Sequence, residues 1–323
     1  MVKWFFLIAM AFVSIWYSLF YGGPAVIKPA ALFIDSSDIH FLNVIRLPRT
    51  LLVFLSGSAL AMAGAISQSI FRNPMAEPAI LGIQSISAFC SVLIISLGLS
   101  TFGLWTVPVF SAAGASLLTF FLLLFHNKTR SIDLTLLTGV AFSLLFGALT
   151  TLVLSISASN YQVGNKLLNW LMGDFEGRGW EHLKLMAFFV IPALFFQLKN
   201  TYGLDLLHLG EDTAASLGLP VASFYRNQIL LLAVIIGTVT ALCGSIGFLG
   251  LIVPHILRPY FGAFHKPLLY SSAILGGAVL VIVDSLNRVI TSINLPPGAF
   301  LSLLGAPFFL WLLFYYHPGH KSP

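Results

Sequence analysis

Apolar side chains fill long runs of the sequence, and short polar stretches separate these runs. A helix needs about 20 apolar residues to cross roughly 30 Å of hydrocarbon, and nine runs approach that length. They predict membrane spans at 4–21, 51–71, 83–98, 105–125, 134–157, 183–198, 227–246, 267–286 and 298–316. A shorter apolar stretch at 247–262 contains Pro254 and Pro259, and it predicts either a short tenth span or a re-entrant segment. Because a β-barrel would show segments of alternating polarity, the pattern predicts an all-α polytopic membrane protein with about ten transmembrane helices.

Composition agrees with this pattern. Hydrophobic residues make up 58% of the 323 residues and charged residues only 8%, whereas a soluble domain carries roughly a quarter charged residues. The polar stretches are too short to hold a soluble domain, so we expect residues 1–323 to form a single transmembrane domain. The net charge of +5 reflects few acidic residues rather than a basic run, which argues against a nucleic-acid partner.

Part of the sequence matches itself after a shift of 180 positions. Gly57, Ala61, Gly64 and Pro74 recur as Gly237, Ala241, Gly244 and Pro254. Five predicted spans separate the two copies, and an odd number reverses their direction. The match therefore predicts an inverted internal repeat, which many transport proteins use to build a central pathway. The small residues have a second explanation, because they allow helices to pack closely in a membrane.

Catalytic and cofactor motifs are absent from the sequence. It contains no GxxxxGK[ST] phosphate loop, no HExxH and no CxxC, so we expect no catalytic residue, no bound metal and no cofactor. Asp284 is the strongest ionisable candidate inside a span, and Arg288 lies one helical turn later on the same face. We predict that the two residues form an ion pair, with a functional use of Arg288 as the alternative. Few buried charges argue against an ion-coupled secondary transporter, which remains the alternative class of transporter.

The longest polar stretch, at about 199–226, has a pattern of its own. Gly210 and Glu211 are followed by small residues as far as Gly218, and Pro220 comes next. This order predicts two short helices separated by a glycine turn. We expect this stretch to lie outside the membrane and to contact another protein.

Several segments, in order, resemble one family of membrane proteins. They are RLPRTLLVFLSGSALAMAGAISQSIFRNPMAEPAILG (46–82), LLTGVAFSLLFGAL (136–149), NWLMGDFEGRGWEHL (169–183), LLHLGEDTAASLGLP (206–220), GSIGFLGLIVPHILR (244–258) and LPPGAFLSLLGAPFFLWLL (295–313). Together they resemble the FecCD-type permeases of bacterial ABC importers, which carry iron–siderophores, haem and cobalamin. The resemblance extends roughly over residues 40–314.

The resemblance implies a multi-pass protein of the bacterial inner (plasma) membrane that is not itself an enzyme. Two identical copies would enclose one pathway in membrane lipid, and two copies of a separate ABC ATPase would bind the cytoplasmic face. A periplasmic or lipid-anchored binding protein would deliver the substrate. On family frequency we expect an iron complex (siderophore or haem), with cobalamin or a molybdate-type oxyanion as alternatives.

The resemblance also implies roles for individual residues. Three arginines at the outer rim, Arg46, Arg49 and Arg288, would bind acidic residues of the binding protein. The alternative is that they have no partner, because arginines at helix ends also extend to the membrane interface. The loop at 206–220 would couple the permease to the ATPase through Gly210, Glu211, Ala215 and Gly218, although its acidic residues can equally be ordinary solvated charges. The loop at 126–133 would form a cytoplasmic gate through Thr129 and Ser131. The fifth span, Leu137 to Ser157, would line the pathway.

Overall fold

The computed structural model describes residues 2–22, 36–77, 82–129, 132–262, 264–289 and 296–315, and these contain helices and no strand. Each predicted apolar run contains a helix, which confirms the all-α prediction. The helices are α1 (Val2–Phe20), α2 (Ser36–Phe41), α3 (Leu47–Ile70), α4 (Ile83–Ser96), α5 (Thr106–Thr129), α6 (Ile132–Ser157), α7 (Tyr161–Leu171), α8 (Trp180–Lys199), α9 (Thr201–His208), α10 (Glu211–Ser216), α11 (Val221–Cys243), α12 (Leu249–Phe261), α13 (His265–Val289) and α14 (Pro297–Tyr315).

The lengths of the helices distinguish full spans from shorter ones. Among the described residues, 7 helices are long and apolar enough to cross a membrane, and α4 and α14 are shorter apolar helices. Helix α12 has only 13 residues, which corresponds to about 20 Å at 1.5 Å per residue. The stretch at 247–262 therefore holds a short helix, and the non-helical residues 244–248 separate it from α11.

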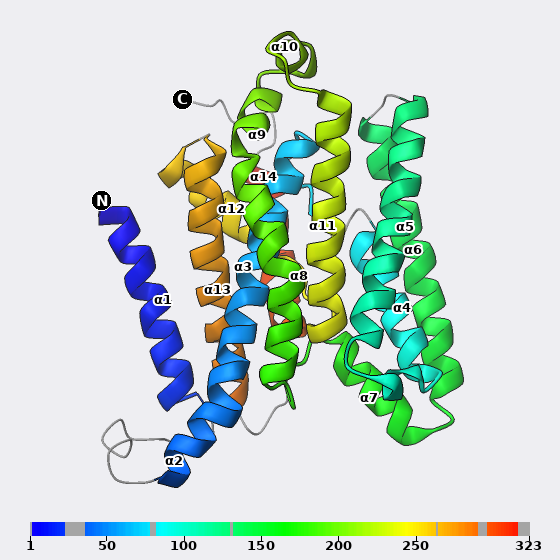
Figure 1. Cartoon of the computed structure of the whole chain (residues 1–323), viewed down its shortest axis with the longest axis vertical. Coiled ribbons are helices and arrows are strands. Elements are labelled where there is room, and N and C mark those ends of the chain that lie inside the picture. The colour runs from blue at the N-terminus through cyan, green and yellow to red at the C-terminus, as the bar shows by residue number, and fades with distance from the viewer. Residues whose placement is uncertain are drawn as a thin grey trace.

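The long helices run side by side between two ends of the molecule (Figure 1). Helix α10 lies at one end, and α2 and α7 lie at the other; these are called the α10 end and the α2 end below. Helices α3, α11 and α13 are mostly buried, whereas most of α1, α6 and α8 is exposed. Apolar side chains cover those exposed helices, as expected of a protein surrounded by lipid.

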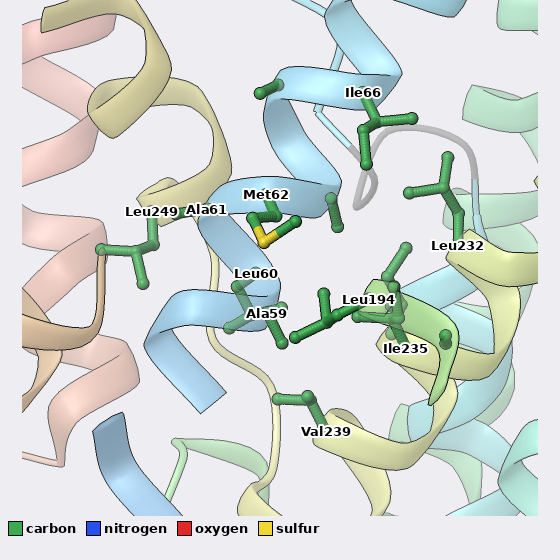
Figure 2. Packing of buried hydrophobic residues seen from close by; sticks show 14 of the residues in the cluster. Ala59, Leu60, Ala61, Met62, Ile66, Leu194, Leu232, Ile235, Val239 and Leu249 are labelled. Carbon is green, nitrogen blue, oxygen red and sulfur yellow. The ribbon is translucent and has the colours of Figure 1, made fainter. Parts of the chain in front are cut away.

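Glycines bring α3 into close contact with its neighbours. A Cβ atom on Gly57 would overlap the backbone of Gly276 in α13, and one on Gly64 would overlap the backbone of Gly250 in α12. Side chains surround these contacts. Figure 2 shows Met62 of α3 in the same region as Leu194 of α8, Ile235 of α11 and Leu249 of α12, and all four are buried in one hydrophobic cluster. Helix α3 is thus the central helix of the core.

The internal repeat is visible in the packing. Helix α3 leads toward the α10 end, whereas α11 leads away from it, so the matched helices run in opposite directions (Figure 1). Helix α3 packs on α13, and α11 packs correspondingly on α5. The first repeat glycine of each copy lies in these contacts: Gly57 faces Gly276, and a Cβ atom on Gly237 would lie 3.0 Å from Ala112 of α5. Both explanations of the small residues therefore hold, since they mark the repeat and also provide the close packing.

Adding one methyl group at Gly64 tests this packing. We expect Gly64→Ala to lower the free energy of unfolding by about 1–3 kcal/mol, because the backbones of α3 and α12 must separate. Gly147→Ala in α6 is the matched control, since its Cβ atom would meet nothing within 4 Å. Thermal unfolding of the detergent-solubilised proteins measures both effects. Equal unfolding midpoints would show that the α3–α12 contact does not require glycine.

Candidate functional site

The arginines predicted for docking cluster at the α2 end, around one acidic residue. Asp284 of α13 is 1% exposed and accepts two hydrogen bonds from Arg49 of α3. Arg49 Nη2 lies 2.7 Å from Asp284 Oδ1, and Arg49 Nε lies 3.2 Å from Oδ2. Such a bidentate arrangement is among the strongest ion-pair geometries in proteins. It ties the first turn of α3 to the C-terminal part of α13.

Arg288 approaches the same carboxylate from one turn further along α13. Its Nε lies 3.1 Å from Asp284 Oδ2, which confirms the ion pair predicted from the spacing. Its Nη2 donates to the hydroxyl of Ser18 in α1 at 2.5 Å. That hydroxyl also lies 2.8 Å from the hydroxyl of Thr50 in α3. Arg288 therefore joins three helices, and its side chain is only 11% exposed.

Arg46 lies beside this cluster and is 4% exposed. It is the last residue of a π-helical turn, Leu42–Arg46, immediately before Leu47 and Pro48, where proline removes a backbone donor from the helix. Its Nη1 donates to the carbonyl of Leu19 at 2.8 Å. The structure thus brings all three predicted arginines together. Around Asp284 the arginines outnumber the carboxylate, so positive charge is in excess there.

The predicted coupling stretch has the expected form. Helices α9 and α10 are separated by Leu209 and Gly210, and Pro220 precedes α11. Gly210 and Gly218 have φ angles of 118° and 89°, which only glycine adopts without strain. Most of α9 is buried, whereas α10 is largely exposed and includes the exposed Ala215.

Glu211 connects this stretch to the rest of the protein. It is half-buried and accepts a hydrogen bond from the hydroxyl of Tyr225 in α11 at 3.1 Å. Arg72, just after α3, approaches the same carboxylate, with 3.7 Å between Nη2 and Oε1. Glu211 is therefore not a freely solvated charge, and it holds the start of α10 against α3 and α11.

The predicted gate falls at the boundary of the described residues. Thr129 is the last residue of α5, and Ser131 lies outside the described residues. A cavity of about 390 Å³ lies elsewhere in the structure, and Thr129 does not line it. Its walls come from α4, α6, the end of α7, the segment before α12 and the start of α14, and they include Gln84, Gly147, Thr150, Ser245, Gly298 and Ser302.

The lining of the cavity shows which face of α6 borders it. Gly147 and Thr150 belong to the predicted pathway span and line the cavity. Gln84 of α4 donates to Ser245 across its wall at 2.6 Å. The lining residues are apolar side chains, glycines, hydroxyls and one amide, and none of those described carries a charge. Such a surface offers a ligand neutral hydrogen bonds and apolar contacts but no ion pair.

Comparison with known proteins now decides the family. A model of the FecCD transport family matches residues 3–315. The chain belongs to the FecCD transport family. The resemblance of the sequence motifs to this family is thereby confirmed.

Two relatives of known function agree with the family assignment. The vitamin B12 import system permease protein BtuC of Pectobacterium atrosepticum is 37% identical over 293 residues, which cover 90% of this chain and 87% of the relative. That of Klebsiella pneumoniae is 36% identical over 313 residues, or 96% and 93%. These relatives are permease subunits, so this FecCD protein is a multi-pass inner-membrane protein and not itself an enzyme.

Solved structures share the fold. A metal-chelate type ABC transporter in an inward-facing conformation superposes with a TM-score of 0.87 at 30% identity, over 96% of this chain and 98% of the other. The PsaBC complex of Streptococcus pneumoniae, solved with a Fab, gives a TM-score of 0.59 at 19% identity, over 90% and 95%. The second likeness shows the fold alone.

The structure of this FecCD protein also identifies buried polar residues that sequence reasoning missed. Glu77 is 8% exposed and accepts a hydrogen bond from the backbone N–H of Phe248, just before α12. A carboxylate at the start of a helix is favourable because the helix dipole is positive there. In the sequence, Glu77 was noted only as part of the family-like segment 46–82. No spacing rule predicted its contact with Phe248.

Removing the charge of Asp284 tests the arginine cluster of this FecCD protein. We expect Asp284→Asn to lower the free energy of unfolding by about 3–5 kcal/mol, because two largely buried guanidinium groups lose their counter-ion. Glu181→Gln is the control, since the Glu181–Lys184 pair is exposed on both sides and contributes less than about 1 kcal/mol. Chemical denaturation in detergent measures both variants. A similar small loss in the two would contradict the structural role of Asp284.

Proposed function

We propose that two copies of this chain form the membrane pathway of an ABC importer for a metal chelate, with a separate ATPase and a separate binding protein. One observation carries the proposal. The chain has no phosphate-binding motif, yet it presents an exposed helix, α10, outside its spanning helices (Figure 1). A transporter of this family that cannot hydrolyse ATP needs a surface that receives force from a protein that can.

We assign the α10 end to the cytoplasm and to the ATPase. Large apolar side chains flank α10, since Leu209 is 63% exposed and Leu217 is 58% exposed. Ala215 and Gly218 add little bulk beside them. Exposed apolar residues around small ones favour insertion into a cleft on a partner.

We assign the α2 end to the binding protein. The excess of positive charge around Arg46, Arg49 and Arg288 attracts acidic residues of a partner. Two of these arginines share the carboxylate of Asp284, so an incoming carboxylate can bind one of them while Asp284 keeps the other. Docking would then change the internal ion pairs of α3 and α13.

The transport cycle follows from these assignments. ATP binding draws the two ATPases together, and their movement reaches the permease through residues 206–220 of each copy. The pathway then alternates between outward-open and inward-open states. ATP and substrate drive the cycle because each binds one state more tightly than the other. Thr129 and Ser131 would form the cytoplasmic gate.

The chemistry of the cavity bears on the substrate. Its uncharged lining suits a large chelate whose metal is already coordinated, and it offers no set of ligands to a free metal ion. The described residues contain no group of three or more metal-ligating side chains. Cobalamin is the first candidate, because the named relatives are vitamin B12 permeases. An iron complex remains the alternative that the sequence resemblance predicts.

A bulky charge on α10 tests the coupling role. We expect Ala215→Arg to reduce binding of the ATPase roughly tenfold or more, because overpacking of a fitted contact costs about 1–3 kcal/mol. Ala158→Arg is the matched control, since Ala158 is equally exposed between α6 and α7 at the other end. Co-purification with the cognate ATPase and ATP hydrolysis by the complex measure the effect. Normal assembly of the Ala215 variant would contradict the assignment of α10.

Uptake into vesicles tests the substrate. The permease, its ATPase and its binding protein are reconstituted together, and cobalamin, a ferric siderophore and haem are offered in turn. We expect ATP-dependent accumulation of cobalamin and none without the ATPase. Accumulation of an iron complex instead would establish the alternative substrate. Accumulation driven by an ion gradient without any ATPase would instead show a secondary transporter and overturn the proposal.

A further inference from the structure

The end of α3 nearest α10 carries polar side chains that contact several neighbouring elements. Gln68 donates toward the carbonyl of Gly250 in α12 at 3.3 Å and accepts from Arg258 at 3.1 Å. Ser69 contacts α13, and Arg72 reaches Glu211 at the start of α10. These contacts connect α3 to elements that are far apart in the sequence. Ser69 is the one that leads to a longer chain of hydrogen bonds.

That chain runs from α3 through α13 to α9. Ser69 Oγ lies 2.5 Å from Nε2 of His265, the first residue of α13. On the other side of the ring, His265 Nδ1 lies 2.5 Å from Oδ1 of Asp205 in α9. The same oxygen accepts the backbone N–H of His265 at 2.8 Å. The hydroxyl of Ser69 has a single proton, which can be donated either to Nε2 of His265 or to the carbonyl of Ala65.

A serine, a histidine and an aspartate in this order also form catalytic triads, but burial argues against a nucleophile here. His265 is 0% exposed and Ser69 is 5% exposed, so no substrate can reach the hydroxyl. Ser69 Oγ also lies 2.9 Å from the carbonyl of Ala65 in its own helix. The chain of bonds therefore serves to hold α9 on α3 and α13.

Asp205 lies in α9, the helix that connects α10 to the spanning helices. Helix α9 packs on both α3 and α13, and Leu204, Leu206 and Leu207 are buried. Only two residues separate α10 from α9, and α10 projects from the molecule (Figure 1). A force on α10 therefore reaches the spanning helices through α9. Asp205 and His265 provide a directional polar contact on that route, and its imidazole is buried whereas its carboxylate is partly exposed.

We propose that His265 is a positioning residue that locks α9 to α3 and α13, so that movement of α10 shifts these two spanning helices as one body. The inference rests on the proposed coupling role of residues 206–220 and extends it to residues that no partner touches. Helices α3 and α13 are already joined by the Gly57–Gly276 contact and by the Arg49–Asp284 pair at the opposite end. His265 adds α9 to this rigid pair.

The test compares transport with ATP consumption in the reconstituted complex of permease, ATPase and binding protein. In His265→Ala, we expect assembly and basal ATP hydrolysis to persist while substrate imported per ATP falls about tenfold, the effect of losing about one charged hydrogen bond. His265→Gln should recover much of the ratio, because its amide both donates and accepts. Tyr270→Ala is the control, since it removes an exposed ring from the same helix, α13, and lies outside residues 206–220. A purely structural role would lower the amount of complex and leave the ratio unchanged.

Ser69→Ala provides a milder version of the same test should His265→Ala fail to assemble. It breaks only the α3 end of the chain, and we expect a smaller fall in substrate imported per ATP. Ser271→Ala is its matched control, since that buried hydroxyl donates to the carbonyl of Leu268 within its own helix, α13. An unchanged ratio in Ser69→Ala, or in an assembled His265→Ala, would overturn the inference.

The outcomes separate this inference from the proposed function. Loss of coupling in Ala215→Arg together with a normal ratio in the His265 variants overturns only the role of His265. Normal coupling in Ala215→Arg overturns the coupling role of α10, and the inference with it. Loss of coupling in both, with the Tyr270 and Ser271 controls intact, supports both.

Discussion

Close contact between α3 and its neighbours is the constraint on which the rest of the structure depends. Lipid provides little hydrophobic driving force between helices, so association in a membrane relies on tight packing and polar bonds. Gly57 and Gly64 allow α3 to touch the backbones of α13 and α12. Any side chain at either position would separate these helices and would pull apart the polar groups at both ends of α3.

The same contact explains how two distant ends can act together. One end of the α3–α13 pair holds Arg49 and Asp284, and the other holds Ser69 and His265. A closely packed pair of helices moves as a body, because packed interfaces change between discrete arrangements rather than deforming smoothly. In the proposed transporter, one end of this pair faces the binding protein and the other faces the ATPase. A signal from either partner can therefore reach the other without any residue that contacts both.

Features with a local pattern were predictable from the sequence, and pairings between distant residues were not. Hydropathy located the spans, glycine and proline located α9 and α10, and spacing of one turn located the Asp284–Arg288 pair. Arg49 lies 235 residues from Asp284, so no spacing rule identified it as the main partner of that carboxylate. Asp205 and His265 are 60 residues apart, and the helices that bring them together become neighbours only in the folded protein.

The charged groups lie at the two ends of the molecule, and the cavity between the helices is lined by uncharged groups. Charged groups are costly inside a membrane and are retained there mainly for ion or proton pathways. Around the cavity, the described lining residues offer only glycines, apolar side chains, hydroxyls and an amide, which distinguish ligands weakly. In the proposed transporter, weak discrimination inside the permease leaves selection to the binding protein. A pathway that binds its ligand weakly also releases it readily, so the energy of the cycle is needed for changing the conformation rather than for removing a tightly held ligand.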